Sequence, residues 1–307
     1  MPPDLSDFTD HFVTLTPNQW LGIPVALIAA AFLALGAQFQ HRGVGRVEAD
    51  TGEIDTSPGL SPKQILLLLG RPSWVIGTVM LGLAVLLQLT SLYLAPIIVV
   101  QPLGATALVI TAIVNARVSK VALDGKSIRA IAFCVGGVGL FVTVAAFTAK
   151  SSPINAAQLG VILAILGVIT MGFSLAFAFL RDRFKAIAFI LGAGVLYGFV
   201  ATLAKVVIDR AKTGDFEWLT VTCIVALLAA AILGGYFVQN AYSSGPPDLV
   251  IAGLTVVDPL VAVTIGIVVL QEAAGAPWFA VVAYIAAGAL AVYGVFQLAK
   301  YHPQAQH

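Results

Sequence analysis

The chain has 307 residues, of which 59% are hydrophobic and only 10% are charged, and its formal net charge is +1. Soluble domains carry about 25% charged residues, so this composition excludes an ordinary soluble globular protein. The near-neutral charge gives no bulk attraction to nucleic acid, and no nucleic-acid partner is expected. Repeated apolar stretches of about 18 residues or more predict an all-α integral membrane protein whose main partner is the lipid bilayer.

The hydropathy pattern predicts nine transmembrane spans. In chain order they cover about 20–38, 74–94, 97–116, 128–147, 157–180, 184–208, 218–238, 248–272 and 278–298. The first 19 residues predict a short acidic tail that lacks the positive start of a secretory signal peptide. The polar stretch after the first span suits a solvated loop, in which the short apolar run 65–69 is expected to be an interfacial helix rather than a re-entrant one.

The basic residues predict the orientation of the spans. Nine spans place the two termini on opposite sides of the membrane. With the N-terminus outside, twelve of the 16 Lys and Arg residues fall on the inner side and three on the outer side, while Lys205 lies within the sixth span. The positive-inside rule therefore predicts a multi-pass plasma-membrane protein with an outer N-terminus and a cytoplasmic C-terminus.

An internal repeat of about half the chain organises the sequence. Val99–Ala105 and Val256–Ala262 are identical at five of seven positions, and each copy lies in an apolar span. The first and sixth spans run in opposite directions, which predicts two inverted four-helix repeats, 20–148 and 184–298, joined by a connector helix at 157–180. The whole chain, 1–307, is expected to form a single transmembrane domain.

The repeat also supplies the main site candidates. Asp258 and Pro259 in the second copy correspond to Gln101 and Pro102 in the first. An ionisable side chain beside a proline within a membrane span is a functional-site hypothesis, and the alternative is a carboxylate that caps a backbone amide freed by the proline. Asp258 follows Pro247 by 11 residues, about 16 Å of helix, which places it near the middle of the membrane. Gln101 is expected to lie nearer its own turn.

Other polar or small residues have two interpretations each. Lys205 is a candidate substrate-binding residue, with anchoring at the headgroups by a snorkelling side chain as the alternative. Glu272 is at a span end and is expected to be solvated. Gly194 and Gly198 have the GxxxG spacing, which indicates close helix packing within the chain or, as the alternative, a homodimer contact.

Enzyme signatures are not recognised in the sequence. Gly125-Lys126-Ser127 resembles the end of a phosphate-binding loop, but Lys120 stands where that loop requires a glycine. Neither catalysis nor a cofactor is expected.

Two hairpins resemble a known family. The segment 241–247, together with Asp258-Pro259 and Gln271-Glu272, resembles the second half of EamA-type proteins of the drug/metabolite transporter superfamily. The segment 94–105 resembles the corresponding hairpin of the NIPA-like branch, described as magnesium transporters. The first half departs from the pattern, because Asn115-Ala116-Arg117 stands where EamA-type halves have a Gly-Glu pair. The resemblance implies secondary transport through a central cavity.

The favoured function is secondary transport of a small molecule, with Asp258 as a proton-coupling carboxylate and Gln101 as a polar partner. The alternative is a NIPA-like transporter of magnesium or another divalent cation, in which Asp258 would be the metal-binding residue, since magnesium favours carboxylate oxygens. A non-transporting membrane scaffold is the third possibility, although the short loops offer it little binding surface.

Overall fold

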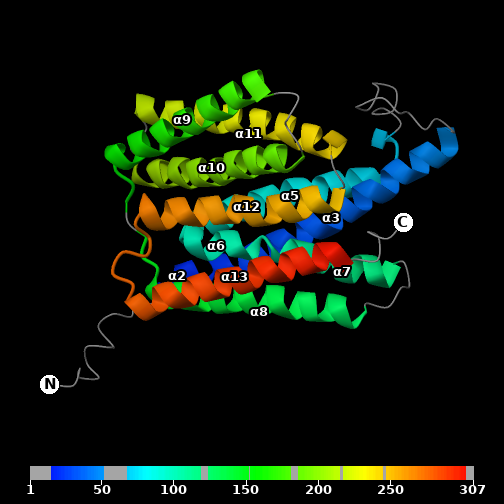
Figure 1. Cartoon of the computed structure of the whole chain (residues 1–307), viewed down its shortest axis with the longest axis horizontal. Helices are drawn as coiled ribbons and strands as arrows, with labels where there is room; N and C mark the ends of the chain where they lie inside the picture. Colours follow the sequence, from blue (N-terminus) through cyan, green and yellow to red (C-terminus); the bar gives the residue numbers. More distant parts are fainter. Residues whose placement is uncertain are drawn as a thin grey trace.

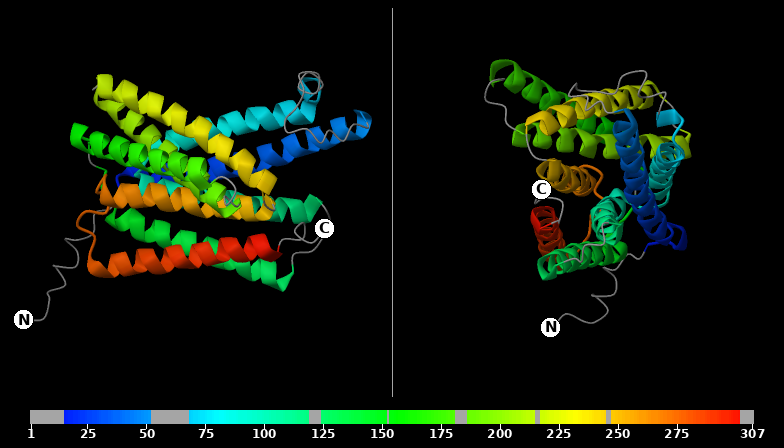
Figure 2. Two further views of the ribbon diagram at one scale, coloured as in Figure 1. Left: turned by 45° about the horizontal axis from the view of Figure 1, so that its top comes forward. Right: turned by 90° about the vertical axis from the view of Figure 1, so that its right-hand side faces the viewer.

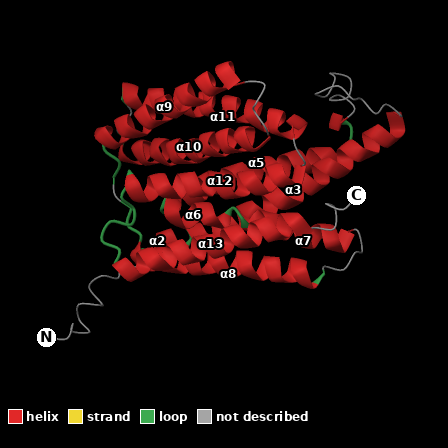
Figure 3. Cartoon of the chain, viewed as in Figure 1, coloured by secondary structure: helices red, strands yellow, loops and turns green. Residues whose placement is uncertain are grey.

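The computed structural model describes residues 15–51, 68–118, 124–151, 153–180, 186–214, 217–244 and 247–301. Within these ranges the regular secondary structure is entirely α-helical (Figure 3). Nine helical spans in the same ranges are long and apolar enough to cross a membrane, which confirms the predicted multi-span membrane protein. The acidic tail up to residue 14 and most of the apolar run 65–69 lie outside the described residues.

The helices follow the predicted spans closely. In chain order they are α2 (Pro17–Trp20), α3 (Gly22–Thr51), α5 (Pro72–Leu94), α6 (Ile97–Leu103), α7 (Thr106–Val118), α8 (Gly125–Thr148), α9 (Ala156–Leu180), α10 (Ala186–Thr213), α11 (Trp218–Ser244), α12 (Pro247–Val268) and α13 (Trp278–Tyr301). The short α2 and the first part of α3 together make the first span, and α6 and α7 together make the third.

The first apolar span, Pro17–Gln40, agrees with the prediction, but helix α3 continues beyond it, and the eighth span ends earlier than predicted. Helix α3 continues to Thr51, so the polar stretch after the first span begins as a helix, and the expectation of a loop is wrong for that part. The extension packs on α5, because a Cβ built at Gly43 would lie 2.7 Å from the Trp74 Cβ. Helix α12 ends at Val268, and the predicted last residues of that span form a loop in which Gln271 has a positive φ of 57°.

The two proline copies of the repeat have different effects on their helices. After Pro102 the amide N–H groups of Gly104 and Ala105 bond to the carbonyls three residues earlier, and α6 ends at Leu103 before α7 begins. Pro259 lies inside the uninterrupted α12. Gly104 of the first copy corresponds to Val261 in the second, and Gly104 itself has ordinary helical angles, with φ −56° and ψ −33°.

Pairs of helices pack closely along glycines. Helix α3 lies along α5, where a Cβ built at Gly36 would be 3.0 Å from the Gly77 carbonyl oxygen. Helix α8 lies along α13, where a Cβ at Gly137 would be 2.4 Å from the Ala291 nitrogen and a Cβ at Gly294 would be 2.3 Å from the Cys134 nitrogen. Without a hydrophobic force between helices in lipid, such small residues permit the close contacts that hold a bundle together.

The proline-bearing helices occupy the middle of the bundle. Figures 1 and 2 show α12 and α6 between a group formed by α9, α10 and α11 and the pair formed by α8 and α13. The first four residues of α6, Ile97–Val100, are completely buried. Helix α9, the predicted connector, lies at the edge of the bundle and contacts α10 and α11 (Figure 1). The repeat segments 99–105 and 256–262 are therefore both central.

Candidate functional site

The two residues that correspond in the repeat, Gln101 and Asp258, line one cavity of about 320 Å³. Helices α3, α5, α6, α10 and α12 all contribute to its wall. Gln88 and Tyr197 are the other polar side chains of this lining, which otherwise consists of aliphatic residues and Gly104. An apolar cavity of this size with a few converging polar groups has the character of a small-molecule site. We call it the central cavity.

Close packing of α10 on α12 positions Asp258. A Cβ built at Gly194 would lie 2.6 Å from the Val257 Cβ, and one at Gly198 would lie 2.7 Å from the Val261 Cβ. The two glycines thus bring the backbones together on either side of Asp258. The GxxxG spacing therefore acts in packing within the chain, as the first interpretation of these glycines predicts.

The Asp258 carboxylate is incompletely satisfied by the protein. Its Oδ1 is buried and has no hydrogen-bond partner among the described residues. A buried polar atom without a partner costs about 1–3 kcal/mol, so this oxygen is an unfavourable feature of the packed helices. Asp258 lines the central cavity together with Gln101 and Tyr197.

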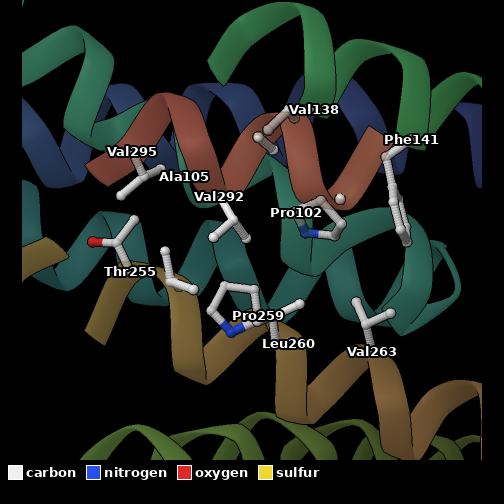
Figure 4. A pocket seen from close by; sticks show the side chains of 13 residues that line it. Pro102, Ala105, Val138, Phe141, Thr255, Pro259, Leu260, Val263, Val292 and Val295 are labelled. Carbon is white, nitrogen blue, oxygen red and sulfur yellow. The ribbon is translucent and has the colours of Figure 1, made fainter. Parts of the chain in front are cut away.

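Pro102 and Pro259 do not line the central cavity. They face a smaller pocket of about 60 Å³ between α6, α8, α12 and α13, and both rings point into it (Figure 4). The other lining residues are almost all apolar and include Val138 and Phe141 from α8 and Val292 from α13 (Figure 4). The prolines and the polar residues of the two repeat copies are therefore divided between two spaces.

Lys205 occupies a different position from either interpretation of the sequence. Its side chain does not line the central cavity and does not snorkel to the headgroups, because Lys205 is only 4% exposed. Its Nζ donates to the backbone carbonyls of Leu92 at 2.7 Å and Ala95 at 2.8 Å. These carbonyls lie at the C-terminal end of α5, where a cation is favoured by the helix dipole.

Glu272 is buried, so the expectation that it is solvated is wrong. Only 3% of the residue is exposed, and its carboxylate accepts hydrogen bonds from the backbone N–H groups of Ile97 at 3.0 Å and Ile98 at 2.9 Å. Burial raises the pKa of Glu272 above its ordinary value, while the ammonium of Lys205 and the two N–H donors act in the opposite direction. Helix α6 brings these donors from the other half of the chain.

Tyr197 is a polar residue of the central cavity that was not predicted from the sequence as a site residue. It lies one residue before Gly198, in the GxxxG segment that packs on α12. A polar aromatic residue beside a packing glycine was the available signal. For a metal ion, the described residues provide no group of three or more His, Cys, Asp or Glu side chains.

Comparison with known proteins adds one relative. No protein-family model matches the chain, and no solved structure matches it. The chain is 26% identical over 262 residues to the uncharacterized protein Cgl0250/cg0304 of Corynebacterium glutamicum, a match that covers 83% of this chain and 86% of that protein. The two proteins are thus similar over most of their lengths.

Proposed function

We propose that the protein is a secondary transporter that moves a small molecule through the central cavity, in exchange for or together with a proton carried by Asp258. One observation carries the proposal: Gln101 and Asp258, which correspond in the internal repeat, line the same cavity. Two repeat copies that meet at one cavity near the membrane centre are the arrangement that allows alternating access.

The pairing of helices supports two inverted four-helix repeats, 20–148 and 184–298. The first two helices of each proposed repeat pack together, α3 with α5 and α10 with α11. The third members, α6 and α12, contact each other in the middle, and the fourth members, α8 and α13, pack along each other. Equivalent helices thus have equivalent neighbours, as an axis of pseudo-symmetry in the membrane plane requires.

The chemistry of the cavity favours proton coupling at Asp258. The lining includes one carboxylate, that of Asp258, and its Oδ1 has no hydrogen-bond partner among the described residues. A low dielectric disfavours the charged form of such a group. Access to water from one side at a time would let the group load and release a proton. Gln101 supplies hydrogen bonds to the substrate without a charge, and the aliphatic wall suits an apolar portion of the substrate.

A NIPA-like function in transport of magnesium or another divalent cation is the second candidate. The unpartnered Asp258 oxygen and the Gln101 amide oxygen in one cavity favour it, since magnesium prefers oxygen ligands. With a single carboxylate in the cavity lining, the ion would keep most of its water molecules. In this case the metal ion is the substrate and not a resident cofactor.

The proposal is tested with the full chain in proteoliposomes. Uptake and efflux of magnesium and of a metabolite panel are measured with and without a pH gradient. Ala201, which lines the central cavity, is replaced by Phe to fill it, and Met171→Phe serves as the matched control because Met171 lies exposed on α9.

The expected result is transport that Ala201→Phe abolishes and Met171→Phe leaves intact. Transport that both variants retain would contradict a path through the central cavity. Absence of transport for every compound, with folded protein in the bilayer, would favour the scaffold. A dependence on the pH gradient distinguishes proton coupling from facilitated passage of a cation.

A further inference from the structure

The turn between α5 and α6 is held by two opposite charges from the second half of the chain. The turn consists of Ala95 and Pro96. Lys205, from α10, binds two carbonyls at the end of α5. Glu272, from the loop after α12, binds two N–H groups at the start of α6. Each charge opposes the partial charge of the helix end that it meets.

The Glu272 side of this arrangement is built closely. A Cβ at Gly266 would lie 2.7 Å from the Ile97 Cγ2 and 3.3 Å from the Glu272 Oε2, so only glycine leaves room for their approach. The backbone N–H of Glu272 donates to the Gly266 carbonyl at 2.9 Å, and the Lys150 backbone N–H donates to the Glu272 carbonyl at 2.6 Å. The carboxylate is therefore aimed at α6 by its own backbone contacts.

The Lys205 side is one residue from the central cavity. Leu92, whose carbonyl binds Lys205, also lines the cavity, as does the neighbouring Ala204. A second lysine, Lys212, lies over the Tyr93 ring at 3.8 Å from its centroid and donates to the Tyr93 carbonyl. The end of α5 is thus fixed to α10 at the edge of the cavity.

We propose that Lys205 and Glu272 form the outer gate of the transporter, holding the α5–α6 turn against the second half so that the central cavity is shut at this end. The inference rests on the proposed function, because a gate has meaning only for a cavity that opens to alternate sides. Opening this end requires both charges to release the turn, and both contacts join the first half of the chain to the second. Glu272 and Lys205 are positioning residues and do not touch the substrate.

The titratable groups that act on Glu272 come from two helices. Lys205 and Asp209 act on it from α10, and Tyr284 faces it from α13. The pKa of Glu272 is raised by burial in the closed arrangement and would return toward its ordinary value on exposure to water.

The gate is tested by measuring distances between spin labels in the full chain without substrate, with Cys134 and Cys223 replaced by Ala. One pair of labels, at Thr90 and Trp218, spans the gated end of α5 and α11, and a second pair, at Val75 and Tyr242, spans the opposite ends of the same helices. Because no substrate is used, the result is independent of whether transport is found.

Glu272→Gln and Lys205→Met are each expected to lengthen the first distance by about 5 Å, the rise of one helical turn, while the second distance stays or shortens. Glu217→Gln, at the same end of the bundle, is the matched control, because the exposed Glu217 pairs with Arg210 and not with the turn. It is expected to change neither distance.

Unchanged first distances in Glu272→Gln and Lys205→Met would overturn the gate. If Glu272→Gln broadens both distances, as a loss of fold would, Glu272→Asp decides, because it keeps the charge but shortens its reach to the two N–H groups. A shift of the first distance alone supports the gate. Unchanged distances in Glu272→Asp, or broadening of both distances in every variant, overturn it.

Discussion

Replacing Gly198 by Ala tests the packing that positions Asp258. The new Cβ would lie 2.7 Å from the Val261 Cβ and 2.9 Å from the Asp258 carbonyl oxygen. Carbon atoms pack best at about 3.5–4.0 Å, so α12 must withdraw from α10 by about 1 Å. The Asp258 carbonyl is backbone and has no alternative rotamer, and overpacking of this kind costs about 1–3 kcal/mol.

The free energy of unfolding of Gly198→Ala is measured by titration with SDS in mixed micelles. Gly136→Ala in α8 is the matched control, because a Cβ there would meet nothing within 4 Å. Ala in place of Gly at an open helical position is expected to stabilise by about 0.4–1 kcal/mol. The two substitutions should therefore change stability in opposite directions. A Gly198→Ala variant as stable as Gly136→Ala would refute the close contact between α10 and α12.

Three further predictions follow from single residues. Pro259→Ala is expected to impair transport more than thermal stability, since a carbonyl freed by the proline regains its bond; loss of stability with full transport per folded molecule would contradict this. Because the folded-state pKa of Glu272 is raised from 4.5, its protonation stabilises the fold below pH 4.5 and this contribution is lost as pH rises through the raised pKa. As pH rises from 4.5 through the raised pKa, the melting temperature should fall in the parent protein and should fall less in Glu272→Gln. Equal pH profiles of the two proteins would contradict this prediction. Cysteines at Ser57 and Ser151, in a chain with both native cysteines replaced, should react with an impermeant reagent in intact cells only at position 151, and the reverse pattern would invert the topology.

The spans and the repeat could be predicted from the sequence because each is recognised from contiguous stretches of residues. Apolar length determines where each membrane helix lies, and helix bounds agree within a few residues for most spans. Identity between 99–105 and 256–262 was enough to select Gln101 and Asp258, which share a cavity. The prolines were selected by the same identity but face a second pocket, because adjacent residues of a helix point about 100° apart.

The roles of Glu272 and Lys205 depended on contacts that no local pattern contains. A glutamate just after an apolar span normally reaches water. Here the two N–H groups that bind it belong to α6, whose chain positions are 175 and 174 residues away. Lys205 likewise meets carbonyls that α5 brings from the first half. The break between α6 and α7 at Gly104 was also not predicted. The proline motif alone does not indicate a break, since Pro259 stands in the same motif without ending α12.

Gradient-driven accumulation by Asp258→Asn tests the central claim most directly. Asn keeps the shape of the side chain and removes its titration. In proteoliposomes with a pH gradient, we expect this variant to bind and exchange substrate but not to accumulate it, whereas a magnesium transporter would lose affinity for the ion whatever the gradient. Accumulation at the level of the parent protein would contradict both and leave Asp258 without a part in transport.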